Sequence, residues 1–307
     1  MPESDRTKVA DVVRHTKRLL HSNTRTELDA VHTTLAADGT TLRLKYLTDG
    51  IRAGSYISLG DGTNPYESMY VHARNGEYAT VQRGVDGSAG YAWPAGTVIE
   101  VEPRFTEWQI LEAVRDAIQA LPSNLYAVAT VAVSFSTTQQ SVTTAFANGF
   151  NQILSATRTA RASEDRLLAF NVKVQEYGGA YEVIRQEGIE KAVTAQLTYA
   201  HPFVSATLDP DTDLVSTVGM TVEMIDIPAL GAAASLLLGE ESLRLDLHSQ
   251  GDSRSDGAVA AGDRARYSLV LQAQYDRRVS QEARRLMAKY GIRTGAAVSS
   301  VFPTTVR

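Results

Sequence analysis

Three closely spaced acidic residues are the candidates for binding a metal ion in this chain. Asp209, Asp211 and Asp213 occupy the first three ligand positions of a calcium-binding loop. Leu214 stands where such a loop needs glycine, and Met220 stands where it needs a closing glutamate. The spacing excludes an EF-hand and leaves a loose surface cation site as the alternative.

Residues with the spacing of an active site are also missing from the sequence. The six histidines show no HExxH-type pairing, and the chain has no cysteine, so a thiolate zinc site and a disulfide are both excluded. Glu100 and Glu102 share one face of an expected strand, but no partner for proton transfer lies nearby in the sequence. We therefore expect no catalytic residue, no metal site, no cofactor and no enzymatic activity.

Two glycine-rich segments have the composition of functional loops but lack the necessary residues. The segment from Gly60 to Pro65 lacks the lysine and the hydroxyl residue of a phosphate-binding loop. The segment from Gly87 to Gly90 lacks the spacer of a nucleophile elbow. Both segments are expected to be turns.

Charge is distributed unevenly along the chain, whose net charge is -5. Arg6 to Arg18 has five basic residues against one acidic residue, and Arg277 to Arg307 has seven against one. Aromatic residues make up 7% and are not interleaved with Arg or Lys, so sequence-specific nucleic-acid binding is not supported. The basic ends favour an acidic partner or non-specific contact with DNA.

Composition and length predict a soluble globular protein. Its 307 residues suffice for two or three domains, and 43% hydrophobic with 21% charged residues is ordinary for such proteins. The longest apolar run, Ala229 to Leu238, is shorter than the ~20 residues of a bilayer span. We expect no membrane segment and no signal peptide.

Three amphipathic helices are expected from the spacing of apolar residues: Lys8 to His21, Phe105 to Leu121 and Gln281 to Tyr290. Thr106 and Gln109 predict a capping box on the second helix. The third is expected to be capped by Ser280 and closed by Gly291. The residues expected to pack these helices together are Val12, Leu19, Trp108, Leu111, Val114, Ile118 and Leu286.

Two β-rich regions separate these helices. The first has short alternating runs at Leu42 to Tyr46, Ser55 to Leu59, Ser68 to Val71, Tyr78 to Gln82 and Thr97 to Glu102. The second has them at Val131 to Phe135, Leu168 to Val174, Val193 to Tyr199, Thr221 to Ile227, Leu243 to Leu247 and Tyr267 to Gln274. Val142 to Ala147 and Ala229 to Leu238 fit either short helices or buried crossings.

The predicted fold class is α+β, with three scaffold helices and two β-insertions. The helical core comprises residues 1–23, 103–122 and 277–291, the small barrel-like β-domain is 24–102, and the larger jelly-roll-like sandwich is 123–276. Residues 292–307 are expected to form an extended arm. Its candidate docking residues are Arg293, Val298, Val301, Phe302 and Arg307, and such an arm could add a strand to the sheet edge of a neighbour.

The most informative segment runs from Gln82 to Arg104. It contains the turn Gln82 to Gly87 (QRGVDG), then Trp93 to Val98 (WPAGTV), and it leads through Pro103 into the capped helix. This order resembles head-to-tail connector (adaptor) proteins of tailed bacteriophages that infect actinobacteria. The resemblance covers Leu42 to Leu121.

The resemblance implies a structural virion protein of the neck, assembled in the host cytoplasm. Such proteins form a ring below the portal, usually twelvefold, which joins the capsid to the tail and lines the DNA channel. The partners that it implies are other copies of the chain, the portal protein, a tail or head-closure protein and passing DNA. The alternative is a tail-tip, baseplate or minor tail protein whose β-modules bind tail components or a host glycan.

Overall fold

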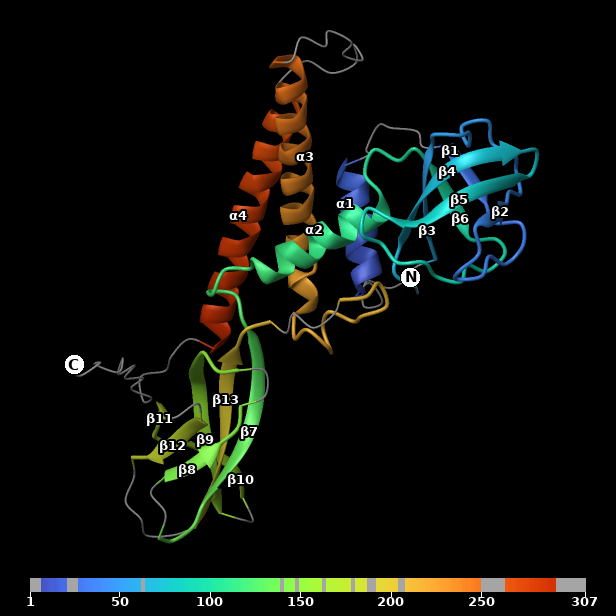
Figure 1. The fold of residues 1–307 in the computed structure, drawn as a ribbon. Helices are drawn as coiled ribbons and strands as arrows, with labels where there is room; N and C mark the ends of the chain where they lie inside the picture. The colour runs from blue at the N-terminus through green and yellow to red at the C-terminus, as the bar shows by residue number, and fades with distance from the viewer. Residues whose placement is uncertain are drawn as a thin grey trace, which may run out of the picture. The chain divides into compact units, whose positions relative to one another are not determined.

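The computed structural model of this chain has a mixed α+β fold with several antiparallel sheets (Figure 1). It describes residues 7–20, 27–61, 64–138, 141–146, 149–161, 164–177, 180–186, 192–203, 208–249 and 263–290. The chain divides into two compact units, residues 1–121 with 205–279 and residues 122–204 with 280–307.

Four α-helices lie within the described residues: α1 (Val9–Leu20), α2 (Glu107–Gln119), α3 (Asp226–Ser249) and α4 (Asp263–Tyr290). A short 3-10 helix, η2 (Val222–Met224), precedes α3. The predicted capping box on α2 is confirmed, because the Gln109 amide donates to the Thr106 hydroxyl and the Gln109 side chain accepts from the Thr106 amide.

Helix α3 is the packing centre of the helical part of the first unit. Both α1 and α2 pack against it, and α4 runs antiparallel beside it (Figure 1). Ser268 on α4 donates a hydrogen bond to the Ala234 carbonyl at 2.8 Å, and Arg278 pairs with Asp226 at 2.7 Å. Between these two contacts, Gly231 leaves room for the ring of Tyr275. Small residues on α3 therefore allow its close approach to α4.

The strands predicted at Thr221 to Ile227, Leu243 to Leu247 and Tyr267 to Gln274 are wrong. These segments form η2 with the start of α3, the middle of α3 and part of α4. Residues four apart share a face in a helix as well as in a strand, so a short alternating run fits both. The last sandwich strand accordingly ends at His201 instead of near residue 276.

Two other expectations about the helices need correction. Ser280 lies inside α4, which begins at Asp263, so it does not cap a short terminal helix. Of the two ambiguous segments, Val142 to Ala147 starts within strand β8 (Ser141–Thr144) and ends at a residue outside the described ones, and Ala229 to Leu238 belongs to α3. Alanine and leucine dominate that part of α3, and both are strong helix formers.

The β-domain, residues 27–101, is a six-stranded antiparallel sheet inserted between α1 and α2. Its strands are β1 (Glu27–Ala30), β2 (Thr41–Arg43), β3 (Tyr56–Gly60), β4 (Glu67–Asn75), β5 (Tyr78–Val85) and β6 (Val98–Val101), in the order β1-β6-β3-β4-β5-β2. A bridge between Val31 and Leu44 joins the two outer strands, so the sheet curves back on itself. Its interior is a cluster of buried residues that includes Leu42, Ile57 and Trp93.

The sandwich, residues 127–201, forms the β-part of the second unit. Strands β7 (Ala127–Phe135), β9 (Gln152–Arg161), β10 (Glu164–Ala169) and β13 (Val193–His201) make one sheet in the order β10-β9-β13-β7. Strands β8, β11 (Val172–Tyr177) and β12 (Ala180–Arg185) make another in the order β11-β12-β8. Both sheets contribute to one core, which contains Phe135, Val183 and Leu197.

One helical window, Val222–Gly239, is long and apolar enough to cross a membrane by composition. Half of it is buried in the fold, where α1 and α2 pack against α3. A buried core helix has the same composition as a membrane span.

The crossing of α3 with α4 predicts a specific sensitivity at Gly231. A side chain at this position would lie 3.2 Å from the Tyr275 ring and 3.5 Å from the Ala117 methyl group. Gly231→Leu should therefore destabilise the first unit by about 1–3 kcal/mol through overpacking. Gly239→Leu is the matched control on the same helix, because nothing lies within 4 Å of a side chain added there. The control should be neutral or stabilising in thermal unfolding followed by circular dichroism, and equal losses in both variants would contradict this account.

Candidate functional site

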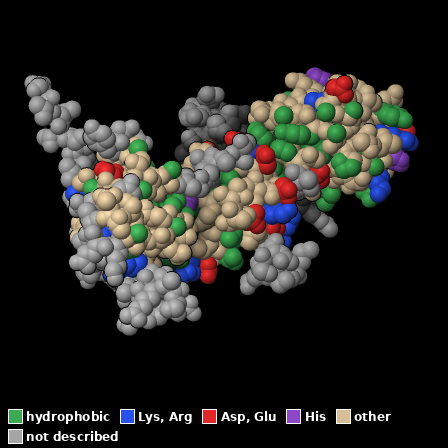
Figure 2. Space-filling view, turned by 90° about the horizontal axis from the view of Figure 1, so that it is seen from below, with side chains coloured by type: hydrophobic (Ala, Val, Ile, Leu, Met, Phe, Trp, Pro, Cys, Tyr) green, Lys and Arg blue, Asp and Glu red, His purple; other side chains and the backbone are tan. Residues whose placement is uncertain are grey.

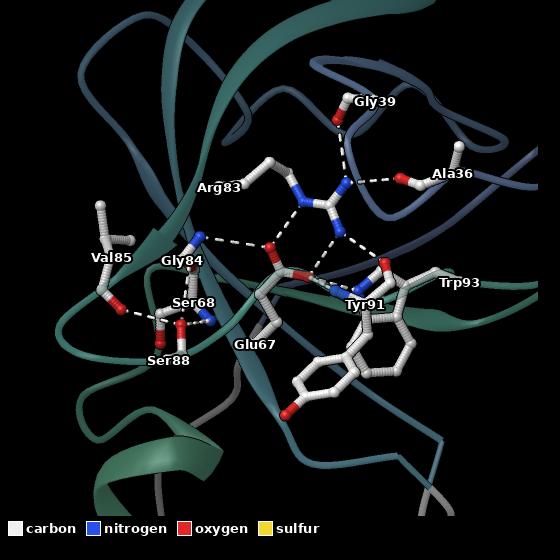
Figure 3. Close-up of polar contacts among 10 residues, drawn as sticks. All are labelled: Ala36, Gly39, Glu67, Ser68, Arg83, Gly84, Val85, Ser88, Tyr91 and Trp93. Carbon is white, nitrogen blue, oxygen red and sulfur yellow. Dashed lines mark hydrogen bonds and ion pairs between the residues drawn. The ribbon is translucent and has the colours of Figure 1, made fainter.

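A buried ion pair between Glu67 on β4 and Arg83 on β5 lies at the centre of the motif segment (Figure 3). The Glu67 side chain is fully buried and that of Arg83 is 9% exposed. The Arg83 Nε donates to Glu67 Oε1 at 2.5 Å, and Nη2 donates to Oε2 at 2.7 Å. This is the fork-to-fork geometry that makes arginine–carboxylate pairs strong.

The remaining hydrogen-bonding groups of this pair are satisfied by the surrounding chain. Arg83 also donates to the carbonyls of Ala36 and Gly39, at 2.7 and 2.9 Å, and to that of Tyr91. Glu67 accepts from the Trp93 indole at 2.6 Å and from the Tyr91 amide at 3.1 Å. One carboxylate and one guanidinium thus join two strands, a loop and the segment that carries the second half of the motif.

The backbone conformation of the turn after Arg83 requires the residue types that the sequence has there. Asp86 and Gly87 both have positive φ, 57° and 86°, as the predicted tight turn demands. Gly84 has φ of 64°, and a side chain there would come within 2.8 Å of the Ser88 carbonyl. The Ser88 hydroxyl accepts from the Ser68 amide at 3.0 Å and donates to the Val85 carbonyl at 2.8 Å. These residues fix the turn against β4.

The motif segment is therefore a determinant of the β-domain fold. Sequence reasoning identified its arginine, glycines and tryptophan but missed Glu67, the group that they surround. The signal for Glu67 was weak, because a single glutamate beside an alternating run has the appearance of a solvated strand end. A fully buried carboxylate requires a cationic partner, and only the strand pairing supplies one.

A second cluster of charges joins α1 to the β-domain and to α2. Lys17 on α1 pairs with Glu107, the first residue of α2, at 2.9 Å, and with Glu100 on β6. All three side chains are mostly buried. Burial lowers the pKa of Lys17, but the two carboxylates outweigh it and hold the pKa above the ordinary value of 10.5. Lys17 therefore stays charged at neutral pH and is not poised as a nucleophile or base.

The pKa of the Glu107 carboxyl is also raised, which for an acid disfavours the charged form. Burial raises its pKa, the nearby Glu100 adds to that effect, and Lys17 opposes it. A cavity of about 610 Å³ lies beside Glu107 and is also lined by Arg14, Lys17, Tyr66 and residues 94–98. The cavity is lined by both basic and acidic side chains, and Lys17 and Glu107 pair with each other there. This arrangement suits a structural contact between α1 and α2.

The three acidic residues considered for a cation site have separate partners. Asp213 accepts hydrogen bonds from the Thr7 hydroxyl and from residues 215 and 216, Asp211 pairs with Lys8, and Asp209 lies 3.5 Å from Arg115. The carbonyls of residues 210 and 212 accept from the first amides of α1. This segment therefore caps α1. Within the described residues, no group of three metal-ligating side chains lies close enough to hold an ion.

The loop from Lys45 to Ile51 is held in a costly conformation and exposes apolar side chains. Leu47 has φ of 58°, a region that a branched residue rarely adopts. The buried Asp29 carboxylate accepts from the amides of residues 30, 45, 46 and 48. Arg74 donates to the carbonyls of residues 47, 48 and 51. As a result Tyr46 is 64% exposed and Leu47 is 47% exposed.

The residues predicted to pack the helices together differ in how deeply they are buried. Val12, Leu111, Val114, Ile118 and Leu286 are buried, whereas Leu19 and Trp108 are half-buried. Arg115 lies over the Trp108 ring at 5.4 Å. The arm residues Arg293, Val298, Val301, Phe302 and Arg307 lie outside the described residues.

Exposed apolar side chains mark surfaces that could contact other molecules. Figure 2 shows hydrophobic side chains gathered on one face of the β-domain, at the upper right. The exposed large hydrophobic residues of this domain are Leu28, Tyr46, Leu47, Tyr56, Tyr78 and Val98. On α4, Leu269 and Val270 are 69% and 51% exposed. Patches of this kind are typical of interaction surfaces.

The buried ion pair predicts a large effect of a small change. Glu67→Gln removes the negative charge but keeps the shape, so the Arg83 guanidinium is left buried without its counter-ion. Breaking such a pair costs about 3–5 kcal/mol. Unfolding followed by tryptophan fluorescence is a suitable measurement, because Trp93 belongs to the network. Glu77→Gln, which breaks the exposed Glu77–Arg43 pair, is the matched control and should change little. A Glu67→Gln variant as stable as the wild type would show that the pair is not needed for the fold.

Asp29 predicts a pH dependence of stability. Burial raises its pKa, but the amides of Tyr46, Thr48 and Ala30 outweigh burial and set the pKa below the ordinary 3.8. A carboxyl with a lowered folded-state pKa stabilises the protein above the unfolded pKa and loses that contribution as the pH falls. Asp29→Asn should thus be less stable than the wild type above about pH 4. Below that pH, the difference in stability between the variant and the wild type should become smaller. Melting temperatures of the variant and the wild type, measured above and below about pH 4, test this prediction. Asp116→Asn, at an exposed position, is the control. A difference in melting temperature that does not change with pH would contradict the role of Asp29.

The chain matches no model of a known protein family and no curated protein.

Proposed function

We propose that this chain is a structural head-to-tail connector of a tailed bacteriophage, which forms a ring below the portal. The observation that carries the proposal is the motif segment from Gln82 to Arg104, which resembles adaptor proteins and leads directly into the capped helix α2. In this proposal the helices form the adaptor scaffold. The β-domain and a jelly-roll-like sandwich are insertions into that scaffold.

The surfaces of the helices support this reading. A ring with head-to-tail contacts needs two different surfaces on each subunit. Helix α4 exposes Leu269 and Val270, while α3 exposes Leu238. Apolar side chains on exposed helix faces are suited to side-by-side packing of helices from neighbouring copies.

Exposed cations on α4 suit the proposed contact with passing DNA. Arg277 and Arg284 are both exposed and lie seven residues apart, so they share one face of the helix. Contacts from arginine to phosphates are independent of base sequence and weaken as salt rises. Such contacts would serve a channel through which DNA of any sequence passes.

The alternative function, recognition of a host glycan by the sandwich, has less support. Sugar-binding surfaces usually present aromatic rings, because apolar faces need an exposed platform to stack on. In the sandwich, Phe146 and Tyr199 are buried, and they stack with Phe150 and Tyr181 at the core. Among the residues described, none of the exposed large hydrophobic side chains comes from the sandwich strands.

Electron microscopy tests the connector function. The purified full-length protein, alone or mixed with the portal protein of the same virus, should form rings in negative-stain images. A Leu269→Glu/Val270→Glu variant should lose the rings, because charge on an apolar helix face opposes its burial between copies. Thr80→Glu, at an exposed position on β5 that is not among the exposed apolar residues, is the matched control. A strictly monomeric species that does not bind the portal would contradict the proposal, and glycan binding by the sandwich would favour the alternative.

A further inference from the structure

Strand β7 is the most exposed pairing edge of the sandwich. It is the outermost strand in the order β10-β9-β13-β7, and it pairs with β13 along its whole length, from Ala127 to Phe135. No strand pairs with its other side among the described residues. In an antiparallel pair, alternate residues direct their N–H and C=O groups away from the partner. One side of β7 therefore presents a row of backbone donors and acceptors.

The other edges of the sandwich are protected and β7 is not. Charged residues occur in β10 (EDRLLA) and in β11 (VKVQEY), and β8 has only four residues. Charges and short length are the usual means by which proteins prevent pairing at an edge. Strand β7 (AVATVAVSF) has nine residues with no charge and no proline. Its sequence favours pairing with another strand.

The chemistry of an open edge selects an extended chain as its occupant. Residues 291–307 follow the end of α4 at Tyr290 and comprise 17 residues beyond it. Fully extended, they span at most about 55–60 Å. The segment has no acidic residue and is rich in Val and Thr, which favour strands. Pro303 is compatible with an edge strand, where one side needs no donor.

We propose that β7 accepts the C-terminal segment, Ile292–Arg307, of a second copy of this chain as an added strand. The inference rests on the proposed function, because a closed ring requires that each copy offer one donor and one acceptor. It places the acceptor of the arm on β7 of the neighbouring copy. Backbone hydrogen bonds to β7 would supply affinity, and Val298 and Val301 would supply side-chain contacts.

Disulfide trapping in the full-length protein tests the proposal, because the natural chain has no cysteine. Ala132→Cys places a thiol on an exposed position of β7, and Val301→Cys places the second in the arm. After mild oxidation, the double variant should shift from the monomer band to a ladder of dimers and higher species in non-reducing electrophoresis. Each copy then carries both a donor and an acceptor, so the ladder can extend. Thr130→Cys and Val298→Cys provide second positions for each partner, in case one variant misfolds or the register differs.

Controls separate strand addition from random collision. Thr80→Cys, exposed on β5, combined with Val301→Cys should give no ladder under the same conditions. A link within one chain would overturn the assignment to a second copy, and the absence of any link from all β7 positions would overturn the acceptor itself. Rings that form without the ladder would contradict this inference alone. A ladder without rings would contradict the connector function and leave strand addition standing.

Discussion

The β-domain depends on one buried ion pair, between Glu67 and Arg83. An unpaired charge at this depth would cost about 3–5 kcal/mol, so each residue of the pair requires the other. Because Arg83 also donates to the carbonyls of Ala36 and Gly39, the pair fixes the loop before β2. Because Glu67 also accepts from Trp93, it fixes the segment before β6. The sheet can close only when both segments are in place.

This dependence changes how the motif segment should be interpreted. Its arginine, glycines and tryptophan are required by backbone geometry and by a buried network, so a resemblance that rests on them reports a type of domain. Contacts with other molecules must come from residues outside the network. The exposed Tyr46 and Leu47 are held by Asp29 and Arg74 in a loop that the network does not include. A side-chain change at Tyr46 would alter this exposed surface without breaking the Glu67–Arg83 network.

The sequence predicted the elements whose signals are local and missed those that depend on distant partners. The capping box of Thr106 and Gln109 is local, as is the Asp86–Gly87 turn, and both occur as predicted. The burial of Glu67 is not local, because its cation lies sixteen residues away across a strand pair. Part of α3, Ala229 to Leu238, was left open between a short helix and a buried crossing, and Leu243 to Leu247 was predicted as a strand. The apolar residues of this helix do not keep to one face, so the helical period is lost. A short alternating run in α4 fits a strand equally well, and only the length of the helix decides between them.

The β-domain and the sandwich differ in whether their outer strands leave backbone groups unpaired. In the β-domain, the bridge between Val31 and Leu44 joins β1 to β2, so the outer strands pair with each other at that point. In the sandwich, no described strand pairs with the outer side of β7 along its nine residues. Closure removes an edge, and an uncharged open edge invites pairing. The β-domain is therefore suited to side-chain contacts through its exposed apolar residues, whereas the sandwich, in our proposal, pairs with another chain through the backbone of β7. Since backbone pairing depends little on the sequence of the added strand, the acceptor can tolerate changes in its donor that a side-chain interface would not.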